Sequence, residues 1–367
     1  IDFLKLKTSY GSTGNSRIGS YRSKGLYNLQ QNGYNGLDGA TTDTAPNGSL
    51  SWEKNTKFNA GIDFNVFKRV ELSVEYYYNA LSDLITTRDI PTETGYSSLQ
   101  LNAADMYNRG FEFSTRIKWV TSDAFKWITS FNISTVQNKV TALKGLGSDY
   151  SQAEVALAQK IGYSTTTIWG INWVGVDPAT GRNLVEKNGK VYDIMTYRSL
   201  YSIADWEPIG DRQPDAYGGF YNSFSFYNNL VLSFRGDFQI GGDFLAQDVL
   251  IDKYSNTSDR NLSVNAYDYW RKPGDIVSQP AVTNNPIVPN LSKYVYDATY
   301  VRLSNVNLSY NVPLKNSFLD ALTVFADATN VAYWYKEKSP KGMNGIRELS
   351  YTYPQARTIS LGVNAKF

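Results

Sequence analysis

The feature that most constrains this chain is an alternation of polar and apolar side chains, sustained over stretches of about ten residues. Residues 57–67 read KFNAGIDFNVF and residues 70–79 read VELSVEYYYN, and in both an aromatic or aliphatic side chain stands at nearly every second position. A period of two predicts β-strands that have one apolar face and one polar face. The short sequence between them, Lys68 and Arg69, predicts a tight turn that joins the two strands as a hairpin.

The same pattern returns along the rest of the chain. Three more pairs of alternating segments are joined by short polar connections, at 121–124, at 228–229 and at 313–320. Single alternating segments open the chain at 3–11 and close it at 358–367. About eleven strands are expected on this template, which makes the chain an all-β protein.

Short turns alternate with long connections, and this asymmetry is typical of an antiparallel transmembrane β-barrel of the outer membrane. The long connections are expected at residues 11–51, 86–104, 139–165 and 242–298. The periodic strands are near or above the ~9–11 residues that a tilted membrane strand needs. Trp119, Phe125 and Trp127 lie beside a short turn, where an aromatic girdle would meet the membrane interface.

The alternation also fits a soluble β-sandwich, in which each sheet has one apolar and one polar face. The second face of this chain is polar throughout, with Glu, Lys, Arg, Asp and Asn. A water-filled lumen tolerates such a face, and the long strands point the same way. We therefore expect a barrel, with a soluble β-rich module as the alternative.

Composition excludes several kinds of function. The chain has no Cys and no His, so thiolate nucleophiles, histidine-based triads and most zinc or iron sites are ruled out. The net charge is only +2, which leaves no electrostatic footprint for nucleic acid. Asp205, Asp211 and Asp215 lack the spacing of a calcium-binding loop. We expect no metal, no cofactor and no enzymatic activity, and the missing histidine disfavours a barrel hydrolase.

Several blocks of the chain resemble the SusC/RagA-like TonB-dependent transporters of the Bacteroidota outer membrane, in the order that the family has them. They include LKLKTSYGSTGNSRIG at 4–19, GVDPATG at 175–181, YDYWRKPGD at 267–275 and YPQARTISLGVNAKF at 353–367. By itself, GVDPATG predicts a turn, because Asp-Pro initiates turns and Gly181 supplies a positive φ. The resemblance covers essentially the whole chain.

The resemblance implies that residues 1–367 are the C-terminal part, about half, of a plugged barrel of about 22 strands. The plug domain, the TonB-contacting segment and the first strands would lie outside this sequence. The expected function is TonB-energised uptake of oligosaccharides or oligopeptides across the outer membrane, with a SusD-like surface lipoprotein as lid and outer-membrane lipid around the barrel. A passive or secretion-linked channel without TonB is the alternative within the membrane.

Two sets of candidate site residues follow. The last strand of an outer-membrane barrel carries the signal for its assembly, and Ser360, Gly362 and Phe367 fit that pattern. We expect Phe367 in an apolar environment, whether it serves assembly or only packs against a neighbouring sheet. The second set lies in the long connection at 242–298, where aromatic faces and polar edges suit a sugar or peptide. These candidates for substrate or lid contact are Tyr254, Tyr267, Tyr269, Trp270 and Arg271. The alternative is that they only hold this connection together.

Overall fold

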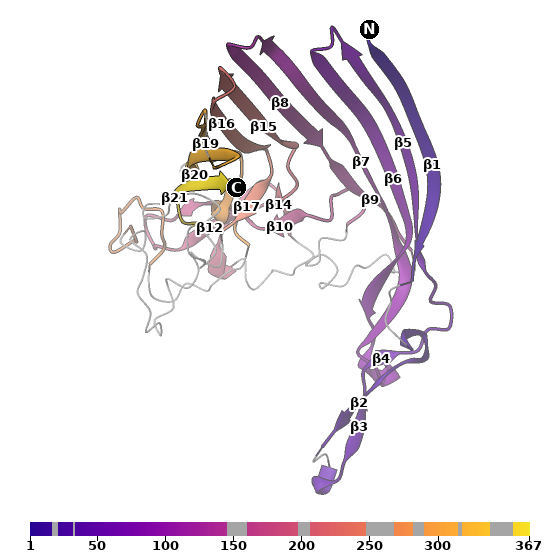
Figure 1. Ribbon diagram of the computed structural model, residues 1–367. Helices are drawn as coiled ribbons and strands as arrows, with labels where there is room; N and C mark the ends of the chain where they lie inside the picture. Colours follow the sequence, from indigo (N-terminus) through magenta and orange to yellow (C-terminus); the bar gives the residue numbers. More distant parts are fainter. Residues whose placement is uncertain are drawn as a thin grey trace.

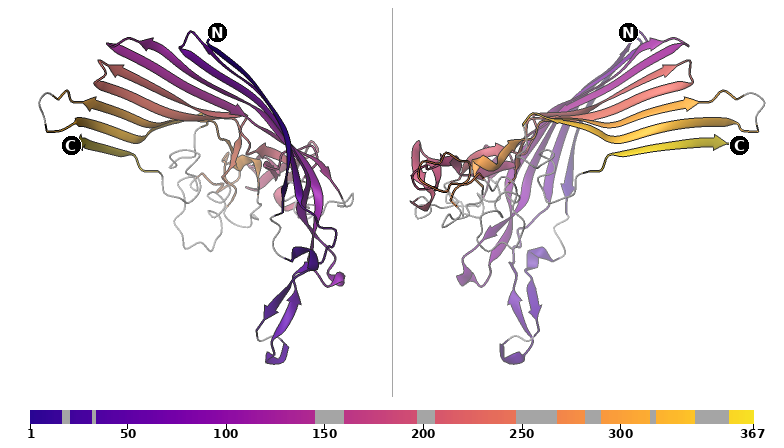
Figure 2. Two further views of the ribbon diagram at one scale, coloured as in Figure 1. Left: turned by 45° about the vertical axis from the view of Figure 1, so that its right-hand side comes forward. Right: turned by 90° about the vertical axis from the view of Figure 1, so that its left-hand side faces the viewer.

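A computed structural model describes residues 1–16, 21–31, 34–144, 160–196, 206–246, 268–281, 290–314, 318–337 and 355–367. One large antiparallel sheet dominates it and curves around one side of the molecule (Figures 1 and 2). Along the sheet the strands are β1 (Phe3–Asn15), β5 (Glu53–Val66), β6 (Val70–Asp89), β7 (Ser98–Thr121), β8 (Phe125–Thr135), β15 (Ala216–Phe226), β16 (Leu230–Ile240), β19 (Tyr300–Asn311), β20 (Ala321–Tyr335) and β21 (Thr358–Lys366).

The ten strands of this path pair in chain order and antiparallel, so the predicted all-β hairpin architecture is confirmed. The hairpins β5–β6, β7–β8, β15–β16 and β19–β20 are the four that the alternation predicts. The turn between β5 and β6 uses positive φ angles at Phe67 and Lys68, and the turn between β15 and β16 uses them at Tyr227 and Asn228. Within the described residues ten strands succeed one another along the main path of the sheet, against the expected eleven or so.

The register carries the alternation across the whole sheet, so that each face has a uniform character. One row of directly paired residues is apolar and runs through Leu6, Ile62, Val74, Phe113, Ile133, Gly218, Phe238, Val301 and Trp334. The residues next in sequence to those of this row form a second row on the opposite face, because successive side chains of a strand point to opposite sides. It runs through Lys5, Asp63, Ser73, Ser114, Asn132, Gly219, Asp237, Arg302 and Tyr333.

The expected long connection at 86–104 is wrong. Here β6 and β7, with 20 and 24 residues, continue past the rest of the sheet, and only residues 90–97 connect them. The register shifts between Leu81 and Leu84, where Asp83 has a φ of 57° and its N–H donates to the Asp105 carboxylate. This bulge lets the hairpin pair onward instead of ending. Strand β9 (Gln137–Leu143) follows β8 and pairs with the extended part of β7.

The described parts of the other connections lie at the end of the sheet away from the tight turns (Figure 1). Residues 16–52 contain the projecting hairpin of β2 (Tyr27–Gln30) and β3 (Gly39–Thr42), and the short β4 (Thr44–Ala45), which pairs with β7. No helix among the described residues is long and apolar enough to cross a membrane.

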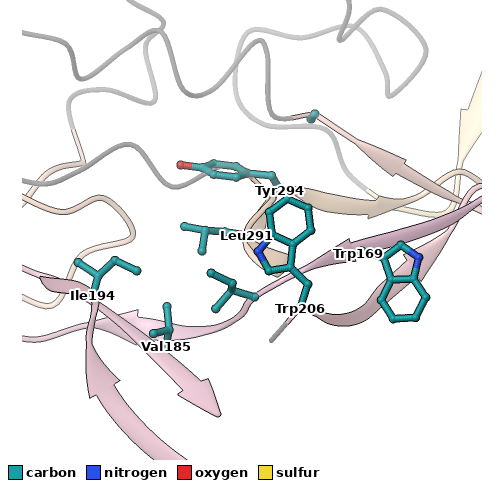
Figure 3. Packing of buried hydrophobic residues seen from close by; sticks show 8 residues of the cluster. Trp169, Val185, Ile194, Trp206, Leu291 and Tyr294 are labelled. Carbon is teal, nitrogen blue, oxygen red and sulfur yellow. The ribbon is translucent and has the colours of Figure 1, made fainter. Parts of the chain in front are cut away.

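The described residues of the connections between β8 and β15 and between β16 and β19 fold together into a compact unit, here called the loop module. It consists of residues 160–196, 206–211, 242–246, 268–281 and 290–298. Its strands are β10 (Thr167–Gly170) with β14 (Glu207–Asp211), β11 (Asn172–Val176) with β12 (Asn183–Lys187) and β13 (Lys190–Asp193), and β17 (Asp243–Leu245) with β18 (Val295–Asp297). Its core is apolar and includes Trp169, Ile171, Val185, Ile194, Trp206, Ala246, Leu291 and Tyr294 (Figure 3).

Candidate functional site

The polar face of the sheet forms a hollow of about 790 Å³ that spans strands β5 to β19. The part of the Asp63 row from Asp63 to Arg302 lines it, together with part of a second polar row, which we call the Arg116 row. The Arg116 row runs through Asn65, Glu71, Arg116, Ser130, Tyr221, Arg235, Asn305 and Thr329. We call the surface that these two rows form the polar wall.

The three carboxylates that line the hollow each pair with a cation. Asp63 lies 2.9 Å from Lys7, and Glu71 lies 3.5 Å from Lys118. Asp237 accepts a hydrogen bond of 2.7 Å from the Arg302 guanidinium and one of 3.1 Å from the Tyr300 hydroxyl. The negative charge of the hollow is therefore neutralised by cations of the same sheet.

Two arginines of the Arg116 row have no such partner. Among the described residues, no carboxylate lies within ion-pair distance of Arg116 or Arg235, and both side chains are exposed. The Arg235 guanidinium lies 5.9 Å from the centre of the Tyr221 ring. The sequence marked both arginines only as polar positions of alternating strands, and the register brings them into one row.

A smaller hollow of about 260 Å³ lies where the sheet meets the loop module, lined by Arg212, Gln239, Asp243 and Tyr300 among others. Burial raises the pKa of Asp243, although its carboxylate accepts a 2.8 Å hydrogen bond from the Asp211 N–H. The neighbouring charges of Asp297, Asp211 and Asp215 raise this pKa further. No group of potential metal ligands is found in the described part of the chain.

The structure brings together two motifs that are distant in sequence. Residues 177–181 form the predicted turn, in which the Gly181 N–H donates to the Asp177 carbonyl at 2.8 Å and Gly181 has a φ of 69°. The pKa of Asp177 is lowered, first by a hydrogen bond from the Thr180 hydroxyl and then by one from the Ala179 N–H. Trp270 lies over this turn, and its indole N–H donates to the Pro178 carbonyl at 2.9 Å.

The expected substrate or lid loop is only partly described. Tyr254 and Tyr267 lie outside the described residues. Arg271 stacks on Tyr269, with 4.8 Å between its guanidinium carbon and the ring centre. Trp270 packs within the loop module, which agrees with the alternative expectation that part of this loop holds the connection together.

A partly buried lysine beside the core of the loop module was not predicted. The Lys293 ammonium lies 5.0 Å from the ring centre of Trp173 and 4.9 Å from that of Tyr294, and donates to the Gln279 side chain at 3.1 Å. Burial lowers the pKa of Lys293 to about 8. Its neighbours in sequence, LSKY at 291–294, gave no sign of this position, because the partners come from distant segments.

The expected assembly residues lie on the terminal strand of the sheet. Ser360 and Gly362 belong to β21 and are paired with β20, where the Phe325 ring covers Gly362 so closely that an added Cβ would lie 2.3 Å from it. Phe367 is 79% exposed, and its ring contacts Phe318 at a centroid distance of 6.0 Å. An apolar environment for Phe367 would therefore have to come mainly from outside the described residues.

Comparison with known proteins supplies an independent result. No family model matches the chain. It is 30% identical over 399 residues to TonB-dependent receptor P26 of Formosa agariphila, and 26% identical over 394 residues to TonB-dependent receptor SusC of Bacteroides thetaiotaomicron. Both matches cover 99% of the chain, but only 40% and 37% of those receptors.

The fold agrees with these sequence matches. A chain of the RagAB peptide transporter superposes on 99% of this chain with a TM-score of 0.80 and 22% identity, and 41% of that chain is covered. The relatives are receptors and transporters by name, not enzymes. The chain is thus a homologue of the SusC-like TonB-dependent receptors and corresponds to a barrel-like portion of them.

Proposed function

We propose that this chain forms part of the wall of an outer-membrane nutrient importer. The observation that carries the proposal is the register of the large sheet, which keeps an exposed apolar row on one face and the polar wall on the other. Leu6 and Trp334, near the two ends of the apolar row, are 75% and 57% exposed. A lipid bilayer on one side and water on the other would accommodate both faces.

Polar groups on the apolar face support this placement. The Trp119 indole N–H donates to the Thr129 hydroxyl at 3.0 Å, and both the Thr129 hydroxyl and the Trp127 indole N–H donate to Asn222 Oδ1, at 2.6 and 3.2 Å. Hydrogen-bonding groups that face lipid must find partners within the protein, because no water is present to serve them. The aromatic cluster lies beside the short turns, as the girdle interpretation requires.

The chain is further proposed to be the C-terminal part, residues 1–367, of a longer plugged barrel. It spans about 40% of the length of the curated relatives it matches. On this proposal a preceding plug engages TonB, a SusD-like surface lipoprotein covers the loop module, and an oligosaccharide or oligopeptide passes along the polar wall. Ser360, Gly362 and Phe367 would be read during insertion into the membrane.

The proposal is tested on the native, full-length protein. Outer membranes are extracted with detergent, the protein is purified through an affinity tag on an exposed loop, and the co-purifying chains are identified by mass spectrometry. A lipoprotein partner and recovery only in detergent are expected. Recovery from the aqueous fraction would favour the soluble β-rich module over the membrane barrel. Solute uptake that survives a protonophore would favour a passive or secretion-linked channel, since import energised through TonB depends on the proton gradient.

A further inference from the structure

We propose that Arg116 and Arg235 form a carboxylate-binding site on the polar wall, suited to an oligomer that carries several carboxylates. The inference rests on the proposed import function and names the chemical class of its substrate. It begins from charge. Each carboxylate that lines the hollow is paired with a cation of this chain, whereas neither of these two guanidinium groups has a carboxylate partner among the described residues. The hollow therefore presents two positively charged side chains that can bind an anionic ligand.

The neighbours of the two arginines suit such a ligand. Arginine binds carboxylates in bidentate fashion through the parallel N–H groups of its planar guanidinium. The Tyr221 ring, 5.9 Å from the Arg235 guanidinium carbon, offers a face for that group to stack on. Stacking on a ring leaves the N–H edges of a guanidinium available to a ligand. Ser130, which is paired with Arg116 in the register, adds a hydroxyl to the same row.

The spacing of the two arginines favours an oligomer over a small anion. They lie on β7 and β16, with β8 and β15 between them. Three strand spacings separate their backbones by about 14 Å. In an extended peptide, residues four positions apart are separated by about 13–14 Å. An acidic peptide or an acidic oligosaccharide could therefore engage both arginines at once.

The carboxylates could instead belong to the rest of the same polypeptide, since the relatives extend well beyond the matched region. A ligand is favoured because the volume of the hollow, about 790 Å³, falls in the range of ligand-binding pockets. The hydroxyl and amide side chains of Ser114, Ser130 and Asn132 line it without charge.

The test measures binding by calorimetry, with the full-length protein purified in detergent. The probes are penta-glutamate and trigalacturonate, with penta-glutamine and maltotriose as neutral counterparts. The variant Arg116→Gln/Arg235→Gln is compared with Lys5→Gln/Lys126→Gln, which removes the same charge from the polar face outside the hollow. At least one acidic probe is expected to bind, and its affinity to fall at least about tenfold in the arginine variant only, because charge-assisted bidentate bonds are lost.

Several outcomes would overturn the proposal. One is an equal loss of affinity in both variants, which would indicate diffuse electrostatic attraction. The others are no loss of affinity in either variant and no binding of either acidic probe. Reduced thermal stability of the arginine variant with unchanged affinity would assign the arginines to the rest of the polypeptide. The choice between penta-glutamate and trigalacturonate separates a peptide from a sugar source. Binding in detergent needs no energised membrane, so failure of this site is distinguishable from failure of the import function.

Discussion

Replacing Gly181 by alanine is expected to loosen the contact between the turn at 177–181 and Trp270. Gly181 has a φ of 69°, and an added Cβ would lie 2.4 Å from the Trp270 ring. The left-handed conformation costs a non-glycine residue about 1–2 kcal/mol. Forcing the ring aside costs about 1–3 kcal/mol, as overpacking does elsewhere. The free energy of local opening should therefore fall by about 2–5 kcal/mol.

The two contributions can be separated because only one depends on the tryptophan. In a Trp270→Ala background the overlap disappears, and Gly181→Ala should cost only the backbone part, about 1–2 kcal/mol. The double variant is then less destabilised than the sum of the single variants by about 1–3 kcal/mol. Trp270→Ala by itself removes the hydrogen bond to the Pro178 carbonyl.

Native-state hydrogen exchange of the full-length protein measures these local free energies. The informative amides are those of Gly181, Gly274 and Ala281, whose N–H groups donate to the carbonyls of Asp177, Pro178 and Gly181 at 2.8 Å each. Peptides from the β15–β16 hairpin serve as the internal control and should not change. The packing of Trp270 on this turn would be refuted if the stability loss of the double variant equalled the sum of the losses in the two single variants. Faster exchange throughout the sheet would refute it as well.

Three further predictions concern charge and assembly. Burial raises the pKa of Asp243, so folded-state stability is lost as pH rises through that pKa. Asp243→Asn should therefore slow hydrogen exchange in β17 at neutral pH, and unchanged exchange would contradict this prediction. The pKa of Lys293 is lowered to about 8, so above pH 8 the unfolded chain binds more protons than the folded chain. The loop module should therefore gain stability as pH rises from 8 towards the ordinary lysine pKa. Lys293→Met should abolish this pH dependence in a series of hydrogen-exchange measurements, and a dependence that survives would contradict the prediction. Deleting Phe367, which is 79% exposed, should reduce the heat-modifiable barrel in outer membranes with little loss of folded stability, whereas Lys366→Ala, the control, should not; equal yields would argue against an assembly role.

Local pattern was sufficient for the hairpins of the sheet. Period-two alternation and a short polar connection are both contained within about 25 residues, so β5–β6 and β15–β16 could be predicted from neighbouring residues alone. The expected connection at 86–104 was wrong because a hydrogen bond to Asp105 and a bulge at Asp83 keep β6 and β7 paired there. A bulge breaks the alternation that a periodic template looks for.

The candidate site was predicted less completely, since its members meet across the fold. Trp270 was predicted to contact a substrate or lid, with packing inside its own connection as the alternative, and it packs on a turn about 90 residues earlier. Lys293 becomes a partly buried cation only because Trp173 and Gln279 come from other segments. Neither contact leaves a trace in local sequence.

The sequence by itself determined the class of structure, because side-chain alternation depends only on each strand and sorts apolar from polar groups without reference to other segments. It also excluded cysteine and histidine chemistry by composition. Only the tertiary structure decided which residues share a row. Register joins Arg116 to Arg235 through two intervening strands, and a shift of one residue at any of these pairings would place the two arginines on opposite faces. Pairing between distant strands thus decides what the polar wall offers to a ligand.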